Sequence, residues 1–190
     1  MMNASEGANE YVKSLTPLAS KYAAEIEAIL AKYPPEERRS AVMPLLHLAQ
    51  RERMYVDRET MGEIGEILGI SSTEVASIVG FYTLYYDKPG GKYHVQVCTD
   101  LPCALRGADK FLQELCERLG ISPGETTEDG LVTVEEVMCL AACDKAPMFQ
   151  VHSGQGLSYH ETQTVENALK LIDELRTMAK RGPGHYESAE

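Results

Sequence analysis

The hydrophobic period of the sequence changes at residues 92–98, which read KYHVQVC. Apolar and polar side chains alternate here, and this alternation is typical of a half-buried β-strand. A second alternating segment, LVTVEEV, occupies residues 131–137. Between the two, residues 108–119 carry apolar side chains at helical spacing, and Gly120 can end that helix. The sequence therefore predicts a β-α-β unit, which is long enough for a parallel, right-handed crossover.

A β-β-α pattern follows this unit. We expect residues 147–152 and 156–160 to pair as a hairpin across Ser153-Gly154-Gln155. Apolar positions within residues 165–175 then recur at helical spacing, and Thr164 can cap that helix. We expect residues 181–190 to form a frayed tail.

Upstream of Pro89-Gly90-Gly91, all apolar stripes have helical spacing. The first stripe runs over residues 18–33 and should end at Pro34-Pro35, where Pro35 suits the first position of the next helix. The second stripe runs over residues 42–49. Pro44 lies inside this second stripe, so we expect a kink or a break there.

Two further helices carry clear start signals. Asp57 can cap a third helix, which Gly69 closes. The segment Ser71-Ser72-Thr73-Glu74 is a capping box for a fourth. Four helices joined by short links predict a small antiparallel bundle, so the whole chain is expected to be of the α+β class.

The composition excludes several functional classes. The chain has 190 residues, of which 44% are hydrophobic and 25% charged, so it is not mainly disordered. No run approaches the roughly 18 apolar residues of a membrane span, and the first residues lack a signal-peptide pattern. The net charge of −11 disfavours binding to nucleic acid.

Four of the five cysteines form two spaced pairs. Cys98 and Cys103 make a C-x4-C pair, and Cys139 and Cys143 make a C-x3-C pair. Each pair begins where a predicted strand ends. Because the carboxyl ends of parallel strands share one edge of a sheet, we expect the four sulfurs to meet there.

Four converging thiolates can hold a [2Fe–2S] cluster, with two ligands per iron, or a single zinc ion. Zinc ribbons favour C-x2-C turns, so the wider spacing here favours the iron–sulfur cluster, as do the small residues of Leu140-Ala141-Ala142. Zinc, or thiols that are only buried or disulfide-forming, are the alternatives. Cys116 lies on the apolar stripe of a predicted helix, where a buried free thiol is expected.

For two groups of residues, the sequence leaves two roles open. Asp100 and Asp144 lie inside or next to the cysteine loops, where they would oppose an added electron or be solvated loop acids. The aromatic residues at the end of the fourth helix are either bundle core or a partner surface. They are Phe81, Tyr82, Tyr85 and Tyr86.

Roughly residues 20–175 resemble the E subunit of bacterial NADH-quinone oxidoreductase, a thioredoxin-like [2Fe–2S] ferredoxin family of respiratory complex I. The resemblance rests on six segments: Tyr33-Pro34-Pro35-Glu36, Arg39-Ser40-Ala41-Val42-Met43-Pro44, Gly80-Phe81-Tyr82-Thr83, Gly91-Lys92-Tyr93-His94-Val95-Gln96-Val97-Cys98-Thr99, Pro123-Gly124-Glu125-Thr126-Thr127 and Cys139-Leu140-Ala141-Ala142-Cys143. One departure is Ala141, where the family often has glycine; we expect tighter loop packing there but not loss of the cluster.

The resemblance implies a thioredoxin-like ferredoxin domain preceded by a helical bundle. It implies one [2Fe–2S] cluster, with Cys98, Cys103, Cys139 and Cys143 as its ligands. The change of hydrophobic period near Pro89-Gly90-Gly91 divides the chain into residues 1–88, residues 89–180 and the tail at 181–190. The resemblance assigns partner docking to the first part and the cluster to the second.

The function implied is electron transfer inside a larger complex. The cluster would exchange single electrons with FMN in the NADH-binding F subunit, so FMN and NADH belong to the partner and the isolated chain has no active site of its own. Other proteins of the peripheral arm would be neighbours, at the cytoplasmic face of the inner membrane and without insertion into it. The alternatives are the equivalent small subunit of an NAD-linked hydrogenase or formate dehydrogenase and, from another class, a zinc-stabilised interaction module.

Overall fold

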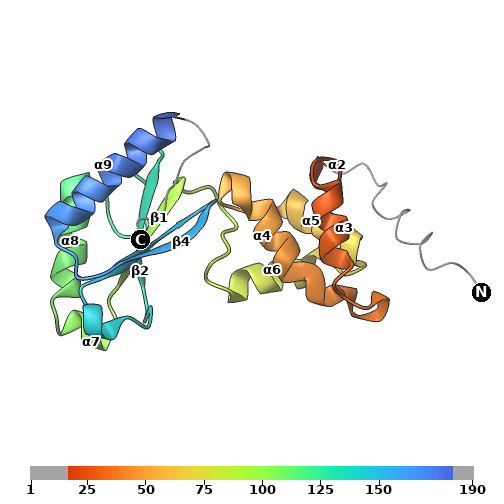
Figure 1. Ribbon diagram of the computed structural model, residues 1–190, viewed down its shortest axis with the longest axis horizontal. Coiled ribbons are helices and arrows are strands. Elements are labelled where there is room, and N and C mark those ends of the chain that lie inside the picture. The colour runs from red at the N-terminus through yellow and green to blue at the C-terminus, as the bar shows by residue number, and fades with distance from the viewer. Residues whose placement is uncertain (1–16, 182–190) are drawn as a thin grey trace, which may run out of the picture. The chain divides into compact units, whose positions relative to one another are not determined.

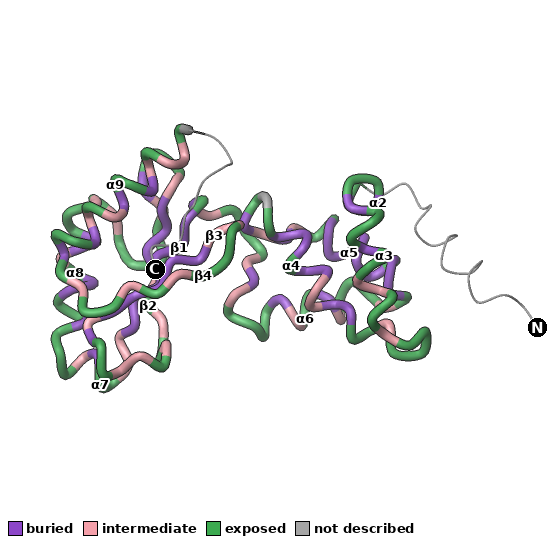
Figure 2. The backbone as a smooth tube through the Cα atoms, in the orientation of Figure 1, coloured by how far each residue is buried: buried purple, intermediate pink, exposed green. Residues whose placement is uncertain are grey.

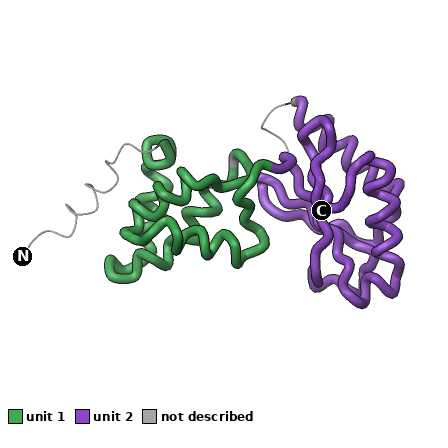
Figure 3. Tube along the Cα trace, turned by 180° about the vertical axis from the view of Figure 1, so that it is seen from behind, with its two compact units in different colours: residues 1–89 green, residues 90–190 purple. Residues whose placement is uncertain are grey.

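The computed structural model describes residues 17–181, so the tail expected at 181–190 lies outside the described residues beyond Arg181. The chain divides into two compact units, Met1–Pro89 and Gly90–Glu190 (Figure 3). The separate roles expected for residues 1–88 and 89–180 stay a prediction.

The first unit is helical over the residues described (Figure 1). Its elements are α2 (Pro17–Lys21), α3 (Ala23–Leu30), the 3-10 helix η1 (Pro35–Ala41), α4 (Val42–Arg53), α5 (Arg58–Leu68) and α6 (Ser72–Phe81). One apolar core joins them, with Ile26, Leu45 and Ile64 among its fully buried members.

Two details of the early helices differ from expectation. The first stripe is split at Tyr22, whose φ of −121° is not helical, into α2 and α3. Pro44 neither kinks nor breaks α4, because the helix begins at Val42 and Pro44 falls in its first turn. Amide groups in the first turn have no intrahelical partner, so a proline there costs no hydrogen bond.

The caps of α5 and α6 are as predicted. The Thr60 amide donates to Asp57 Oδ1 at 2.9 Å, and Gly69 closes α5 with a φ of 69°. The reciprocal capping box between Ser71 and Glu74 starts α6. The chain turns by 117° between these two helices, short of the near reversal of an antiparallel pair, and the antiparallel bundle stays a prediction for the unit.

Within residues 17–181, no single helix is long and apolar enough to cross a membrane. Helices α5 and α6 reach the length and apolar composition of a membrane span only when they are taken together, and the chain bends by 117° between them.

The second unit has the predicted β-α-β and β-β-α order. Its elements are β1 (Tyr93–Cys98), α7 (Leu101–Ala104), α8 (Ala108–Leu119), β2 (Val132–Val137), the 3-10 turn η2 (Cys143–Lys145), β3 (Phe149–Ser153), β4 (Gly156–His160) and α9 (Val165–Arg181). The strand order is β2-β1-β3-β4, with β1 and β2 parallel and the other neighbours antiparallel. The short helix α7, inside the first cysteine loop, was not predicted.

The two faces of this sheet have different chemistry. Helices α8 and α9 both cover one face, where they pack on Val95, Val134 and Phe149 in one core (Figure 1). The opposite face carries polar side chains that are nevertheless buried, among them Gln96 and Gln150. Strands β1 and β3 are buried along nearly all their length, as their colour in Figure 2 shows.

These two glutamines and the half-buried Glu135 form a chain across the strands, which we call the glutamine ladder. Gln96 donates from Nε2 to Glu135 Oε2 at 3.0 Å, and Gln150 donates from Nε2 to Gln96 Oε1 at 2.6 Å. Buried polar groups are stable only when hydrogen-bonded, so the ladder links β2, β1 and β3. His94, on the same face, lies 2.9 Å from Glu135 through Nδ1.

Two glycines of α5 give a matched test of the packing at the α5–α6 turn. A Cβ on Gly65 would lie 2.8 Å from the Ile70 carbonyl oxygen and 3.3 Å from the Ser72 nitrogen, whereas a Cβ on Gly62 would meet nothing within 4 Å. We expect Gly65→Ala to lower the free energy of unfolding by about 1–3 kcal/mol, because backbone atoms must move. We expect Gly62→Ala to raise it by about 0.5–1 kcal/mol, because alanine favours the helix.

Denaturant unfolding of the full chain measures both glycine variants. A change in the same direction for the two would contradict the close approach at Gly65.

Candidate metal centre

The two cysteine pairs lie at the same edge of the sheet because β1 and β2 are parallel. Cys98 is the last residue of β1 and faces Val137, the last residue of β2. The pairing continues for one more step, since the Thr99 amide donates to the Val137 carbonyl at 3.1 Å. Cys139 follows only two residues later, so the two loops leave the sheet side by side, as the sequence predicted.

The first pair is buried. Cys98 and Cys103 are each 1% exposed and pack with Ala108, Ala146 and Met148 in a small apolar cluster of their own. The turn between them is set by Asp100, whose Oδ1 accepts a hydrogen bond from the Leu101 amide at 2.9 Å. The Asp100 carbonyl accepts another from the Cys103 amide at 2.8 Å, so α7 turns the chain back toward the end of β1.

The second pair is more open to solvent. Cys139 is exposed and Cys143 is half-buried, and their sulfurs are 3.7 Å apart. The Ala141 amide donates to Cys139 Sγ at 3.3 Å. This geometry needs Ala141 in the left-handed region, with a φ of 61°, which is where the resemblance had suggested glycine.

The pKa values show that the four thiols lie within electrostatic reach of one another. The pKa of Cys103 is raised to about 12, first by burial, then by a hydrogen bond with Cys98 and by the charges of Cys98, Cys143 and Cys139. The pKa of Cys143 is also raised, first by its hydrogen bond with Cys139, then by burial and by the charges of Cys139, Cys98 and Asp100. A positive metal centre would remove these penalties, because it stabilises thiolates.

The sulfurs are arranged as two pairs. Two thiolates on one tetrahedral ion, with metal–sulfur bonds of about 2.3 Å, lie roughly 3.8 Å apart, which the Cys139–Cys143 distance matches. Cys98 and Cys103, the other pair, lie together in the small apolar cluster. The spacing of Cys139 and Cys143 therefore suits two ligands of one metal ion, and a [2Fe–2S] cluster takes two such ligands on each of its irons.

The fifth thiol takes no part in this arrangement. Cys116 is 3% exposed and lies in the core between the sheet and its helices, as predicted from its place on the apolar stripe. Burial, and then the charge of Glu125, raise the pKa of this thiol.

The acidic residues beside the loops have different positions. Asp100 is half-buried, caps α7, and its charge contributes to the raised pKa of Cys143. Asp144 is exposed. Its carbonyl oxygen accepts a hydrogen bond from Arg106 Nη1 at 3.2 Å, and sequence reasoning did not single out this arginine.

The aromatic residues near the end of α6 divide between the two interpretations. Tyr85 is 6% exposed, belongs to the helical core, and donates its hydroxyl to the Met43 carbonyl at 3.1 Å. Phe81 is 76% exposed and Tyr82 is 42% exposed, and their rings are in edge-to-face contact. Tyr86 is half-buried.

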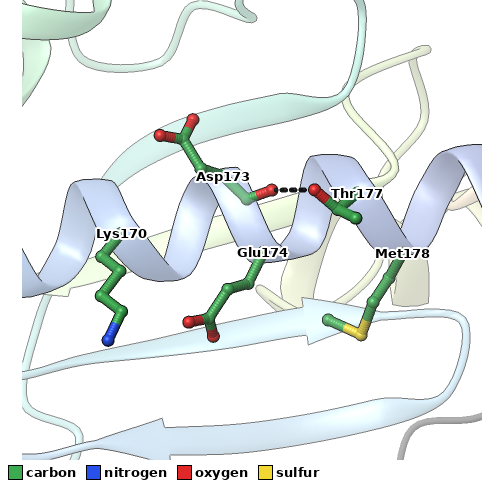
Figure 4. A pocket seen from close by; sticks show the side chains of 5 residues that line it. All are labelled: Lys170, Asp173, Glu174, Thr177 and Met178. Atoms are coloured by element: carbon green, nitrogen blue, oxygen red, sulfur yellow. Dashed lines mark hydrogen bonds between the residues drawn. The ribbon is translucent and has the colours of Figure 1, made fainter.

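A hollow of about 670 Å³ lies along α9, a helix that carries none of the cysteines (Figure 4). Among residues 17–181, those that line it belong to this helix: Lys170, Asp173, Glu174, Thr177 and Met178. The Thr177 hydroxyl donates to the Asp173 carbonyl of its own helix at 2.9 Å. We assign this surface no role in the metal centre.

Comparison with known proteins places this geometry in a family. The family model for the thioredoxin-like [2Fe-2S] ferredoxin matches residues 26–176. NADH-quinone oxidoreductase subunit 2 of Thermus thermophilus is 47% identical over 127 residues, which is 67% of this chain and 70% of that protein. The E 2 subunit of NADH-quinone oxidoreductase from Rhizobium meliloti is 40% identical over 152 residues, 80% of this chain and 87% of that protein.

Two other similarities are more limited. The E subunit of NADH-quinone oxidoreductase from Mycobacterium tuberculosis is 40% identical over 161 residues, 84% of this chain, but the chain spans only 62% of that protein. Among solved structures, an NAD+-reducing [NiFe]-hydrogenase is similar with a TM-score of 0.59 and 20% identity, over 70% of this chain and 22% of that one. At this identity the likeness shows the fold alone.

Adjacent alanines in the second loop test the left-handed residue. We expect Ala141→Gly to raise the free energy of unfolding of the metal-free chain by about 0.5–1 kcal/mol, because it relieves the cost of a positive φ while keeping the amide that contacts Cys139. Ala142, with a φ of −117°, is the control. We expect Ala142→Gly to lower that free energy by about 0.5–1 kcal/mol, through the entropy of the unfolded chain.

Urea unfolding under reducing conditions gives both free energies. Stabilisation by both substitutions would show that loop packing, and not the backbone angle of Ala141, is the cause.

Proposed function

This chain belongs to the thioredoxin-like [2Fe-2S] ferredoxin family, and from that premise we propose that it is the [2Fe–2S] electron-transfer subunit of an NADH-quinone oxidoreductase. We propose Cys98, Cys103, Cys139 and Cys143 as the ligands of its cluster. When bound, the cluster supplies one-electron chemistry that no amino-acid side chain of the chain provides on its own.

The observation that carries this proposal is the meeting of four thiols, in two pairs, at one edge of the sheet. The 3.7 Å between Cys139 and Cys143 suits two ligands of one iron. The raised pKa of Cys103, caused by burial and by the other three cysteines, suits a site completed by positive charge.

The surrounding residues hold and adjust these ligands. The Ala141 amide stabilises negative charge on the Cys139 sulfur, as hydrogen bonds to cluster sulfurs do in this class of site. The small apolar cluster around Cys98 and Cys103 excludes water from the inner pair. Asp100, through its charge, opposes the addition of an electron and so favours a low reduction potential.

We propose that the electrons come from a partner protein, the FMN- and NADH-binding F subunit, which would approach the open side of the site. Cys139 is exposed there, and three large apolar residues of the same loops are exposed with it: Leu101 at 68%, Leu105 at 80% and Met138 at 71%. Exposed apolar groups around a redox centre suit contact with another protein. Through that complex the chain would lie at the cytoplasmic face of the inner membrane, beside other proteins of the peripheral arm.

The helical unit provides a second contact surface in this proposal. Phe81 and Tyr82 present aromatic rings to solvent, and aromatic residues are enriched at the centres of protein interfaces. Residues 1–88 would thus dock the partner, while residues 89–180 hold the cluster.

Substitution of the thiols tests the cluster. We expect Cys98→Ser, Cys103→Ser, Cys139→Ser and Cys143→Ser each to lose most of the iron, the acid-labile sulfide and the visible absorbance, because each removes a ligand. Cys116→Ser, in the hydrophobic core, should keep them. Full cluster content in any of the four, or zinc with no sulfide in the wild type, would overturn the proposal.

Substitution of Phe81 tests the docking surface. We expect Phe81→Ala to weaken co-purification with the flavin-binding partner at least tenfold, because exposed aromatic anchors contribute most to interface affinity. Its cluster content should be unchanged. Leu157→Ala, at a residue 47% exposed on β4, is the control. Equal binding of both variants and the wild type would remove the helical unit from the interface.

A further inference from the structure

We infer that Arg106 is a positioning residue, which ties the two cysteine loops together and favours the reduced form of the cluster through its positive charge. This inference rests on the proposed function, because it presumes a [2Fe–2S] cluster at the four thiols. It concerns a residue of the first loop that acts on the second.

The geometry of Arg106 is that of a bridge between loops. The residue follows Cys103 by three, and its amide donates to the Cys103 carbonyl at 3.0 Å, so its backbone is fixed to the first loop. Its side chain reaches the second loop, where Nη1 lies 3.2 Å from the Asp144 carbonyl oxygen and 3.5 Å from the Ala146 carbonyl oxygen. These two carbonyls belong to the first and third residues after Cys143.

The bridge adds a charged donor to the contacts that already hold this segment, which are the apolar cluster of Cys98 and Cys103 with Ala146 and Met148, and the hydrogen bond from the Thr162 amide to the Lys145 carbonyl at 2.8 Å. The strands fix the start of each loop through the pairing of Cys98 with Val137. Beyond the strands, Cys143 lies four residues further along than Cys139, in a segment with only the short turn η2. A hydrogen bond from a charged donor is stronger than one between neutral groups, so the guanidinium is well suited to hold that segment.

The positive charge of Arg106 favours the reduced form of the cluster, whereas the hydrogen bonds of the bridge alone do not favour either redox state. A cluster with two ferric ions, two sulfides and four thiolates carries a charge of about −2, and reduction adds one more negative charge. Asp100 opposes this addition, and a guanidinium anchored to the residue after Cys143 offsets part of that opposition. Because Arg106 is exposed, solvent and salt screen this effect and keep it modest.

Three substitutions separate the bridge from the charge. Arg106→Lys keeps the charge but loses the planar fork, Arg106→Gln keeps a donor but loses the charge, and Arg106→Met loses both. Arg118→Gln is the control, since Arg118 stands in the last turn of α8, roughly 15 Å along that helix from its start.

The charge is tested by redox titration of the cluster-containing chain. At a fixed potential, we expect the ratio of reduced to oxidised cluster to fall about threefold in Arg106→Gln and in Arg106→Met, a shift of about 28 mV for one electron. Raising the salt concentration should shrink the difference. Arg106→Lys and Arg118→Gln should keep the wild-type ratio. An unchanged ratio in Arg106→Gln, or an equal fall in Arg106→Lys, overturns the role of the charge.

The bridge is tested without the cluster, by hydrogen exchange of the metal-free chain. The Lys145 amide donates to the Ala142 carbonyl at 3.0 Å, and it reports on the segment that Arg106 holds. We expect this amide to exchange at least fivefold faster in Arg106→Met than in Arg118→Gln. Equal exchange overturns the bridge.

The two proposals fail in different ways. A wild-type chain without iron and sulfide would contradict the proposed function. A wild-type chain that holds the cluster, with a potential and an exchange rate indifferent to Arg106, would contradict only the inference about this residue.

Discussion

The parallel pairing of β1 with β2 is the constraint on which the metal centre depends. It sets Cys98 opposite Val137 and sends both cysteine loops out from the same edge of the sheet. An antiparallel pairing of the same two strands would place the pairs at opposite ends of a six-residue strand, roughly 17–20 Å apart. The crossover through α8 therefore brings Cys103 and Cys139, which are 36 positions apart in the sequence, to the same edge of the sheet.

The sequence alone was sufficient to predict the order of the four strands with helices α8 and α9, and the edge of the sheet at which the cysteine loops begin. The reason is that each of these features has a local signal: alternation in residues 93–98, helical spacing in residues 108–119, and glycines after the helices. The caps at Asp57 and Ser71 were predictable on the same ground, since a cap is a contact between residues three apart.

Other features could not be predicted because they depend on contacts between distant residues. The bridge from Arg106 spans 38 positions to Asp144, and nothing in the adjacent residues indicates where that side chain goes. The left-handed backbone at Ala141 has no signal in the residue itself, because alanine rarely adopts a positive φ. Tyr85 is buried and Phe81 is exposed because α6 ends at Phe81, so the residues after it leave the helix. The helical spacing of apolar residues does not predict that C-terminal end.

The glutamine ladder also disfavours pairing of β2 with β1 in a wrong register in the metal-free chain. If β2 slipped by two residues along β1, its side chains would keep their faces, but Cys139 and Cys143 would be displaced by about 6.6 Å. That slip would also part Gln96 from Glu135 inside the sheet, and an unsatisfied buried polar group costs about 1–3 kcal/mol. Purely apolar neighbours would tolerate the shift more easily. The polar contacts thus penalise a mispaired sheet, so that iron meets a site whose spacing is already correct.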